Sequence, residues 1–249
     1  ENIASAHRAR SARLLSICQT FPIALQGIDQ LYNRLDAHAD ALRASTVPGT
    51  ARLVDRAHGD FETAVEALLS GRHHVVSDAM RDTMEIELLL VAFTLEPGRF
   101  AEWESADRDV LVKKFGPAQL RKRIADKVFD TPMDLPDQFE YQVHSAVTHP
   151  TPDGQISTLF VEESSADLAA MFLADMLEHG RRMLAASGSL IDALGVGESV
   201  AEVDTSSMRA TLEMFNEQMR ARLEAAGATQ LLPVREPVHR GSRRNILKL

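Results

Sequence analysis

Apolar residues recur at three- and four-residue steps along most of the chain, which is the period of an amphipathic α-helix. The clearest stretch begins at Pro22, a residue suited to the first turn of a helix, and ends before Pro48-Gly49. Its apolar positions fall on one helical face: Ile28, Leu31, Leu35, Ala39 and Leu42.

Glycine and proline divide the rest of the chain into further predicted helices. One passes through residues 14–18, a second covers 53–68 and stops at Gly71, and a third runs from His73 to Leu95. Later segments are predicted as helices over 105–115 (with Ser105 as its cap), 117–128, 136–148, 164–183, 190–194 and 208–223, with a short strand or extended link at 156–161. The pattern predicts an all-α fold, a multi-helix antiparallel bundle of about seven to nine helices.

No Gly/Ser-rich linker divides the chain, so we expect one helical domain over residues 1–226 and a basic C-terminal tail over 227–249. The whole chain has a formal net charge of −9, which disfavours general nucleic-acid binding. The tail nevertheless carries Arg240, Arg243 and Arg244. We expect these three arginines either to bind RNA or another protein, or only to solubilise the tail.

Composition and the lengths of the apolar runs indicate whether the chain crosses a membrane and which kind of compartment suits it. The longest uninterrupted apolar run, Leu88–Phe93, is far shorter than the roughly 20 residues that span a bilayer, so no membrane helix is expected. The single cysteine, Cys18, excludes a disulfide within the chain and favours a reducing compartment such as the cytoplasm. Apolar neighbours predict that Cys18 is buried. No signal-type apolar stretch follows Glu1, although a leader could precede it.

The segment from His73 to Leu95 combines a strongly apolar end with charged residues. It is predicted to be a central, buried helix, yet it contains Glu87. Arg81 and Glu85 stand four residues apart and are expected to pair across one turn. Two interpretations stay open: a polar pocket built on this helix, or a structural ion pair that fixes how the helices pack.

A second polar segment surrounds residues 141–150. It contains Tyr141, His144, Ser145 and His149, and Pro150 follows at the end of the predicted helix. Imidazole, phenol and hydroxyl groups on one short helix suit acid–base chemistry or phosphate binding. The alternative is structural, with His144 hydrogen-bonded in the core and His149 capping the helix end.

We expect these two polar segments to face each other, because neither has enough partners within its own helix. In that arrangement His144 would donate a hydrogen bond to Glu85 or Glu87, and Arg81 would reach acceptors on the later segment.

The residues Arg81-Asp82-Thr83-Met84-Glu85, together with Tyr141, His144-Ser145 and His149-Pro150, resemble a group of uncharacterised bacterial all-helical proteins. That group is similar to HEPN-type bundles, which include ribonuclease toxins and phage-defence effectors. The resemblance covers about residues 60–150 and implies a metal-independent ribonuclease. The nuclease pattern of that family is Arg, four to six intervening residues, and then His. It occurs here as Arg52 to His58, with Leu53 where the family has a polar residue. With 22 arginines and nine histidines, about two such matches are expected by chance.

Metal sites of bundle di-iron proteins use Glu-x-x-His on two helices, and none of the predicted helices carries that motif. Glu140 and His144, four residues apart, could both reach one metal together with Glu87 or His149. No cofactor is predicted.

Two classes of function therefore remain. The leading hypothesis is a binding or regulatory helical bundle that acts through protein–protein contacts, as a homodimer, in bacterial stress or phage defence. The alternative is a HEPN-like metal-independent ribonuclease of a toxin or defence system. Under either hypothesis, the candidate site residues are Arg81, Glu85, Tyr141, His144, Ser145 and His149.

Overall fold

The computed structural model describes residues 3–127, 141, 144, 165–196 and 201–225. These residues form nine α-helices and one short 3-10 helix, and no strand occurs among them. The prediction of an all-α multi-helix bundle is therefore confirmed. Among the helices of this described part, none is long and apolar enough to cross a membrane.

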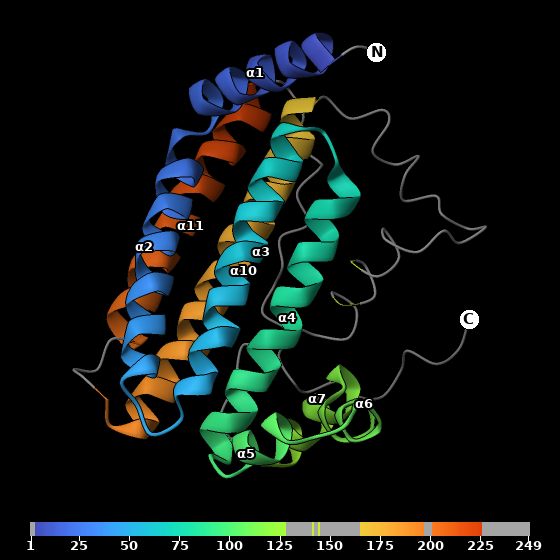
Figure 1. Cartoon of the computed structure of the whole chain (residues 1–249). Coiled ribbons are helices and arrows are strands. Elements are labelled where there is room, and N and C mark those ends of the chain that lie inside the picture. Colours follow the sequence, from blue (N-terminus) through green and yellow to red (C-terminus); the bar gives the residue numbers. More distant parts are fainter. Residues whose placement is uncertain (1–2, 128–140, 142–143, 145–164, 197–200, 226–249) are drawn as a thin grey trace, which may run out of the picture. The chain divides into compact units, whose positions relative to one another are not determined.

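Four long helices form the core of the bundle: α2 (Pro22–Arg43), α3 (Ala51–Leu69), α4 (His73–Leu95) and α10 (Ser165–Leu194). Helix α3 packs against α2 and α4, and α10 packs against the same two helices from the other side (Figure 1). Helix α3 runs opposite to its chain neighbours, but α10 runs in the same direction as α2 and α4. A parallel neighbour requires a long connection, and residues 96–164 separate α4 from α10 in the sequence.

The apolar stripe predicted on α2 is the stripe that the structure buries. Leu31, Leu35 and Leu42 have no exposed surface. Close approach of α10 to α2 depends on Gly180, since a Cβ atom there would lie 2.6 Å from Leu31 Cδ2. Gly71, in the turn between α3 and α4, has a φ of +71°, a conformation that glycine adopts without steric cost.

Helix α4 packs against α3, α10 and α7, and it stands on the side of the four long helices away from α2 rather than at their centre (Figure 1). Its apolar half is largely buried, and Leu88 and Leu90 have no exposed surface. Glu87 is also buried, at 1% exposure. The core therefore contains an acidic side chain that needs a partner.

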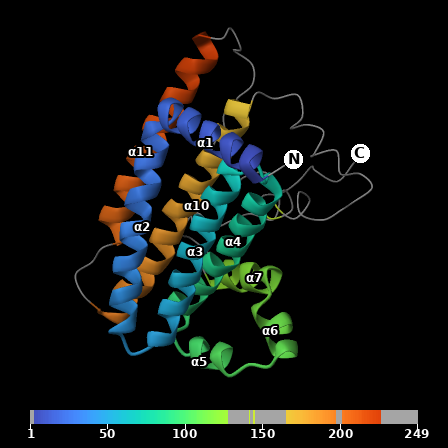
Figure 2. The same cartoon turned by 45° about the horizontal axis from the view of Figure 1, so that its top comes forward.

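Shorter helices cover the two ends of the core. Helix α1 (Ile3–Thr20) crosses one end, while α5 (Arg99–Glu104), α6 (Arg108–Phe115) and α7 (Pro117–Lys127) follow the far end of α4 (Figure 2). The 3-10 helix η1 (Pro48–Thr50) connects α2 to α3. Arg99 is buried under these short helices, with its guanidinium 4.7 Å from the centre of the Phe115 ring.

The chain divides into two compact units, residues 1–216 and 217–249. The boundary falls within the last helix, α11 (Ala201–Ala225). In the first unit, Asp204, Met208 and Phe215 are buried along one face of α11. The Phe215 ring meets the Phe21 ring edge-on at the start of α2.

Three local predictions are wrong. Ser105 ends α5 by donating to the Ala101 carbonyl, and Asp107 caps α6 by accepting from the Val110 amide. Gly188 does not separate two helices, because α10 is continuous to Leu194. Cys18 is exposed, since α1 lies on the surface of the bundle and Ile17 is its buried residue.

Other predictions lie outside the described residues. These are most of the 136–148 helix, the strand at 156–161, the side chains of Ser145 and His149, and the basic tail with Arg240, Arg243 and Arg244.

The buried face of α4 gives a direct test of the core. Leu90→Ala removes a completely buried side chain and should lower the free energy of unfolding by about 2–5 kcal/mol, measured by urea denaturation. Leu89→Ala, on the neighbouring and partly exposed position, is the matched control and should cost clearly less. Equal losses in the two variants would contradict the packing described here.

Candidate functional site: a buried histidine and carboxylate cluster

The two polar segments singled out in the sequence meet at one point. The Tyr141 hydroxyl donates to Glu85 Oε1 across 2.9 Å, and the Arg121 guanidinium lies 5.1 Å from the centre of the Tyr141 ring. Burial and the hydrogen bond to Glu85 raise the pKa of Tyr141, so it stays protonated as a donor. Among the ion pairs of the described residues, Arg81 contacts Asp78 at 3.7 Å and not Glu85. The expected Arg81–Glu85 pair is therefore not formed.

His144 is buried, but it faces α10 and not the carboxylates that we expected on α4. Its Nε2 lies 3.5 Å from Asp175 Oδ2, and its ring packs edge-on against the ring of His179, with 5.6 Å between centres. The expected hydrogen bond to Glu85 or Glu87 is thus replaced by contacts to two residues of α10.

Glu87 has a different histidine partner. His179 Nδ1 lies 3.0 Å from Glu87 Oε1, a hydrogen bond between two side chains that are both almost completely buried. Asp175 stands one helical turn before His179 on α10, and its Oδ1 lies 3.7 Å from His179 Nε2. His179 therefore presents one ring nitrogen to Glu87 and the other to Asp175.

This geometry sets the charge of the cluster. Burial by itself lowers the pKa of His179, but the charge and hydrogen bond of Glu87, with the charge of Asp175, outweigh it and raise the pKa to about 9. Burial likewise opposes ionisation of Asp175, yet His144 and His179 hold its pKa below the usual range. In the metal-free protein a protonated His179 lies between two carboxylates.

His144, Asp175 and His179 also offer three ligand atoms that all lie within 4.8 Å of one another. Ligands placed about 2.1 Å from a tetrahedral metal ion lie roughly 3.4 Å apart. His144 Nε2 lies 3.5 Å from Asp175 Oδ2, and His179 Nε2 lies 3.7 Å from the other carboxylate oxygen, Oδ1. Both separations are close to that value and longer than most hydrogen bonds. The spacing would allow all three side chains to bind one cation.

Sequence reasoning found His144 and Glu87 but missed Asp175 and His179. The sequence feature that could have identified them is a carboxylate and an imidazole four residues apart on a predicted helix, a spacing that places both side chains on one face. The metal hypothesis paired His144 with Glu140, a residue outside the described part, instead of with α10.

A second buried cluster lies further along α10. His38 of α2 contacts Ser187 Oγ through Nδ1 at 2.7 Å and Asp204 Oδ2 through Nε2 at 3.0 Å. These residue types match a hydrolase triad, but Ser187 has no exposed surface and also donates to the Met183 carbonyl at 2.7 Å. A nucleophile must reach its substrate, so this cluster ties three helices together and does not form an active site.

A carboxyl pair spans α3 and α4. Burial and the neighbouring Asp82 carboxylate raise the pKa of Asp60 to about 7, although Arg56 acts in the opposite direction. Arg56 Nε also donates to Asp82 at 2.7 Å, and its side chain is 63% exposed. Asp82 is therefore held by a surface arginine, which favours a structural role for the pair.

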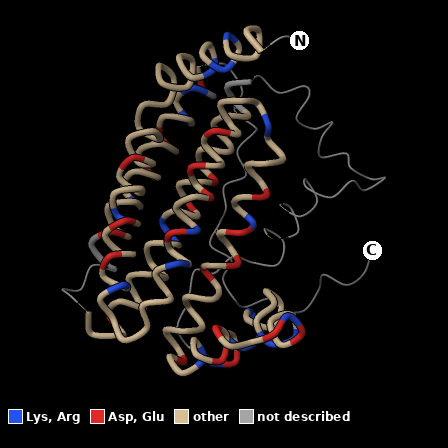
Figure 3. The backbone as a smooth tube through the Cα atoms, viewed as in Figure 1, with Lys and Arg blue, Asp and Glu red and all other residues tan. Residues whose placement is uncertain are grey.

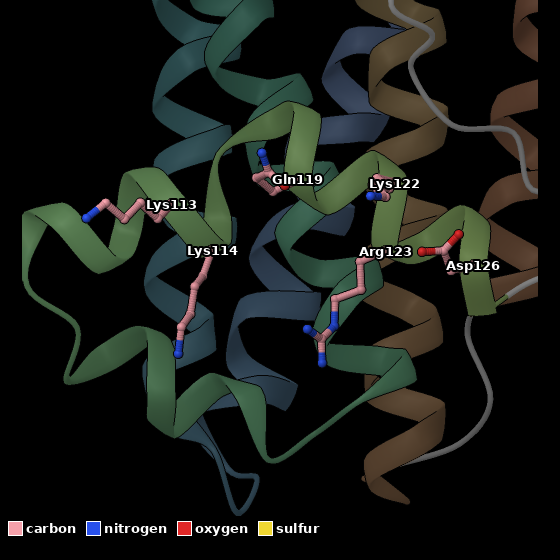
Figure 4. A pocket seen from close by; sticks show the side chains of 6 residues that line it. All are labelled: Lys113, Lys114, Gln119, Lys122, Arg123 and Asp126. Atoms are coloured by element: carbon pink, nitrogen blue, oxygen red, sulfur yellow. The ribbon is translucent and has the colours of Figure 1, made fainter.

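A pocket of about 250 Å³ lies along α6 and α7, where positive and negative residues alternate (Figure 3). The residues that line it are Lys113, Lys114, Gln119, Lys122, Arg123 and Asp126. Their labelled side chains do not converge on one point (Figure 4). Lys114 and Arg123 already pair with Glu102 and Glu96, each at 2.6 Å. The pocket therefore lacks the geometry of an anion site.

The two residues of the ribonuclease pattern have other contacts. Arg52 pairs with Glu104 of α5, while His58 lies 3.0 Å from Asp36 and packs against the ring of Tyr32. These contacts hold each side chain against a neighbouring element of the bundle.

The electrostatics of the cluster predict a pH dependence of stability. His179 has a raised pKa in the folded state, so its contribution is complete below about pH 6.5 and is lost as the pH rises through about 9. In chelator-treated protein, the free energy of unfolding should fall by an amount on the order of 3 kcal/mol across that window. Glu87→Gln removes the main charge that raises the pKa, so urea titrations of this variant should show a smaller fall. An unchanged fall would contradict the assignment.

Comparison with known proteins adds no relative: no family model, no curated protein and no solved structure is found to match this chain. The resemblance to HEPN-type bundles therefore stays a prediction, and the geometry of the site carries the functional argument.

Proposed function

We propose that the protein is a metal-binding helical bundle that holds one divalent transition-metal ion between His144, Asp175 and His179. The observation that carries the proposal is the convergence of these three buried or half-buried donors within 4.8 Å. The proposal supersedes the metal-free interpretation of the same region, because the residues that converge include two on α10.

The donor set supports a particular class of metal. Two imidazoles and one carboxylate suit zinc and neighbouring divalent transition metals, whereas magnesium and calcium prefer oxygen donors. Glu87 supports the same assignment, since metal-bound histidines commonly donate their second ring N–H to a carboxylate. That hydrogen bond directs His179 Nε2 toward the other two donors.

A metal at this place would join α10 to His144, which comes much earlier in the chain, and would rest on α4 through Glu87. A metal ion that connects these segments favours the interpretation of the protein as a binding or regulatory module whose shape depends on metal occupancy. This agrees with the leading hypothesis from the sequence. We do not extend the proposal to a ribonuclease, because Arg52 and His58 each contact other groups.

Metal binding can be tested with two matched substitutions on α10. After chelation and dialysis, the protein should bind about one zinc ion per chain in isothermal titration calorimetry. Asp175→Asn removes an anionic ligand and should weaken zinc binding at least roughly tenfold. Asp192→Asn makes the same change at an exposed position of the same helix and should leave binding unaltered.

Circular dichroism would establish that both variants remain helical. Failure of the unsubstituted protein to bind zinc, cobalt or nickel, or equal affinity in the Asp175 and Asp192 variants, would refute the proposal.

A second candidate function, self-association, is favoured by the character of α1. This helix contains Arg8, Arg10 and Arg13 and no acidic residue, although the whole chain has a net charge of −9. It also exposes Leu15 at 61%. Arg10 pairs with Glu66 of the same chain, so Arg8 and Leu15 are the groups that this helix offers to a partner. The occupant we propose is a second copy of this chain, whose net charge is negative.

Light scattering coupled to size-exclusion chromatography tests this self-association. The unsubstituted protein should be dimeric, and Leu15→Glu should shift it toward the monomer by placing an acidic group in the contact. Val112→Glu, at an apolar residue 67% exposed on α6, is the control and should leave the dimer intact. A monomer at high concentration, or equal behaviour of both variants, would contradict self-association through α1.

A further inference from the structure

We propose that Tyr141 is a positioning residue of the metal site, whose hydrogen bond to Glu85 holds the helical turn that carries His144 in place for metal binding. This inference rests on the metal-binding function proposed above. It concerns two residues that are not among the three donors of the site. Their role is to make the approach of His144 to the metal reproducible.

The first argument is that the two imidazoles of the site are held in different ways. His179 Nδ1 hydrogen-bonds to Glu87 of α4, and its Nε2 is thereby directed toward Asp175. Metal-bound histidines commonly have such a partner, because it fixes the direction of the ring. His144 Nδ1 is buried and has no hydrogen-bond partner within the described part of the chain. The placement of His144 therefore depends on how its own helical turn is held.

The second argument is the contacts of that turn. Tyr141 and His144 are both helical and stand three residues apart, so their side chains leave neighbouring positions of one helix face. The Tyr141 hydroxyl donates to Glu85 Oε1 across 2.9 Å, and the Arg121 guanidinium lies 5.1 Å from the centre of the Tyr141 ring. Tyr141 thus fixes the turn to α4 and α7, while His144 reaches Asp175 of α10.

The third argument is that both imidazoles then depend on one helix. Glu85 and Glu87 stand two residues apart on α4, and they accept hydrogen bonds from Tyr141 and His179 respectively. A hydrogen bond to a carboxylate is stronger than one between neutral groups, and the Tyr141 side chain is only partly exposed to competing water. Helix α4 would therefore set the separation of the two imidazoles without contributing a ligand itself.

Zinc titration of the chelated full-length chain provides the experiment. Tyr141→Phe removes the hydroxyl and keeps the ring that packs against Arg121. It should weaken zinc binding roughly fivefold, less than the loss of about ten- to hundredfold that is common for a group bonded directly to a metal ligand. Tyr32→Phe is the matched control, because it makes the same change at the other tyrosine of the chain, on α2. It should leave zinc affinity within about twofold of the unsubstituted value.

A double-mutant cycle isolates the hydrogen bond. Glu85→Ala removes the acceptor and one charge, so its own effect on zinc affinity combines two causes. Introducing Tyr141→Phe into the Glu85→Ala protein should have no further effect, because the hydroxyl has already lost its partner. A full fivefold loss in that background would overturn the role assigned to the Tyr141–Glu85 hydrogen bond.

Urea denaturation with and without zinc separates positioning from a purely structural role. A structural hydrogen bond lowers the free energy of unfolding equally in both states, whereas a positioning one lowers it more in the zinc-loaded protein. Equal lowering in the two states, or equal zinc affinity of the Tyr141 and Tyr32 variants, would overturn the inference while leaving metal binding intact. Failure of the unsubstituted protein to bind zinc, cobalt or nickel would refute the proposed function and this inference with it.

Discussion

The central constraint on this bundle is the burial of Glu87 in the middle of its most apolar helix. A carboxylate at 1% exposure destabilises the fold unless another group compensates its charge, and His179 supplies that group at 3.0 Å. The contact fixes α4 against α10 at one register. It also sets which nitrogen of His179 points toward Asp175 and His144, so the fold and the candidate metal site depend on the same hydrogen bond.

Helix α10 carries both buried polar clusters of the described core. Asp175 and His179 face α4 and His144, whereas Ser187, two turns further, contacts His38 and thereby Asp204. Burial lowers the pKa of His38 against the opposing effect of Asp204, which keeps this imidazole neutral near pH 7. One cluster concentrates charge where a cation could bind, and the other joins α2, α10 and α11 through hydrogen bonds of His38 and an ion pair of Arg34 with Asp204.

Periodicity predicted the bundle well because each long helix buries one continuous apolar face. The bounds of α4 match the prediction, since Gly71 and Pro97 stop the neighbouring turns. Capping by Ser105 was wrong because Asp107 is an equally good cap two residues later. Cys18 was placed in the core because an apolar sequence does not show that α1 lies on the surface.

The site was predicted only in part, and the reason is topological. The two polar segments were expected to face each other, and Tyr141 does contact Glu85. The expected partner of Glu85 or Glu87 was His144, which contacts Asp175 instead. Asp175 and His179 were missed because the sequence does not reveal that α10 runs parallel to α4 and brings its carboxylate to His144. Contacts between residues so distant in the chain depend on helix order, which periodicity alone does not determine.

The most direct test of the account is X-ray diffraction at the zinc absorption edge from crystals of the zinc-loaded protein. The account predicts one anomalous peak about 2.0–2.2 Å from nitrogen atoms of His144 and His179 and an oxygen of Asp175, with Glu87 still bound to His179 Nδ1. A zinc ion held elsewhere, or a cluster in which His179 contacts both carboxylates with no metal between them, would contradict it.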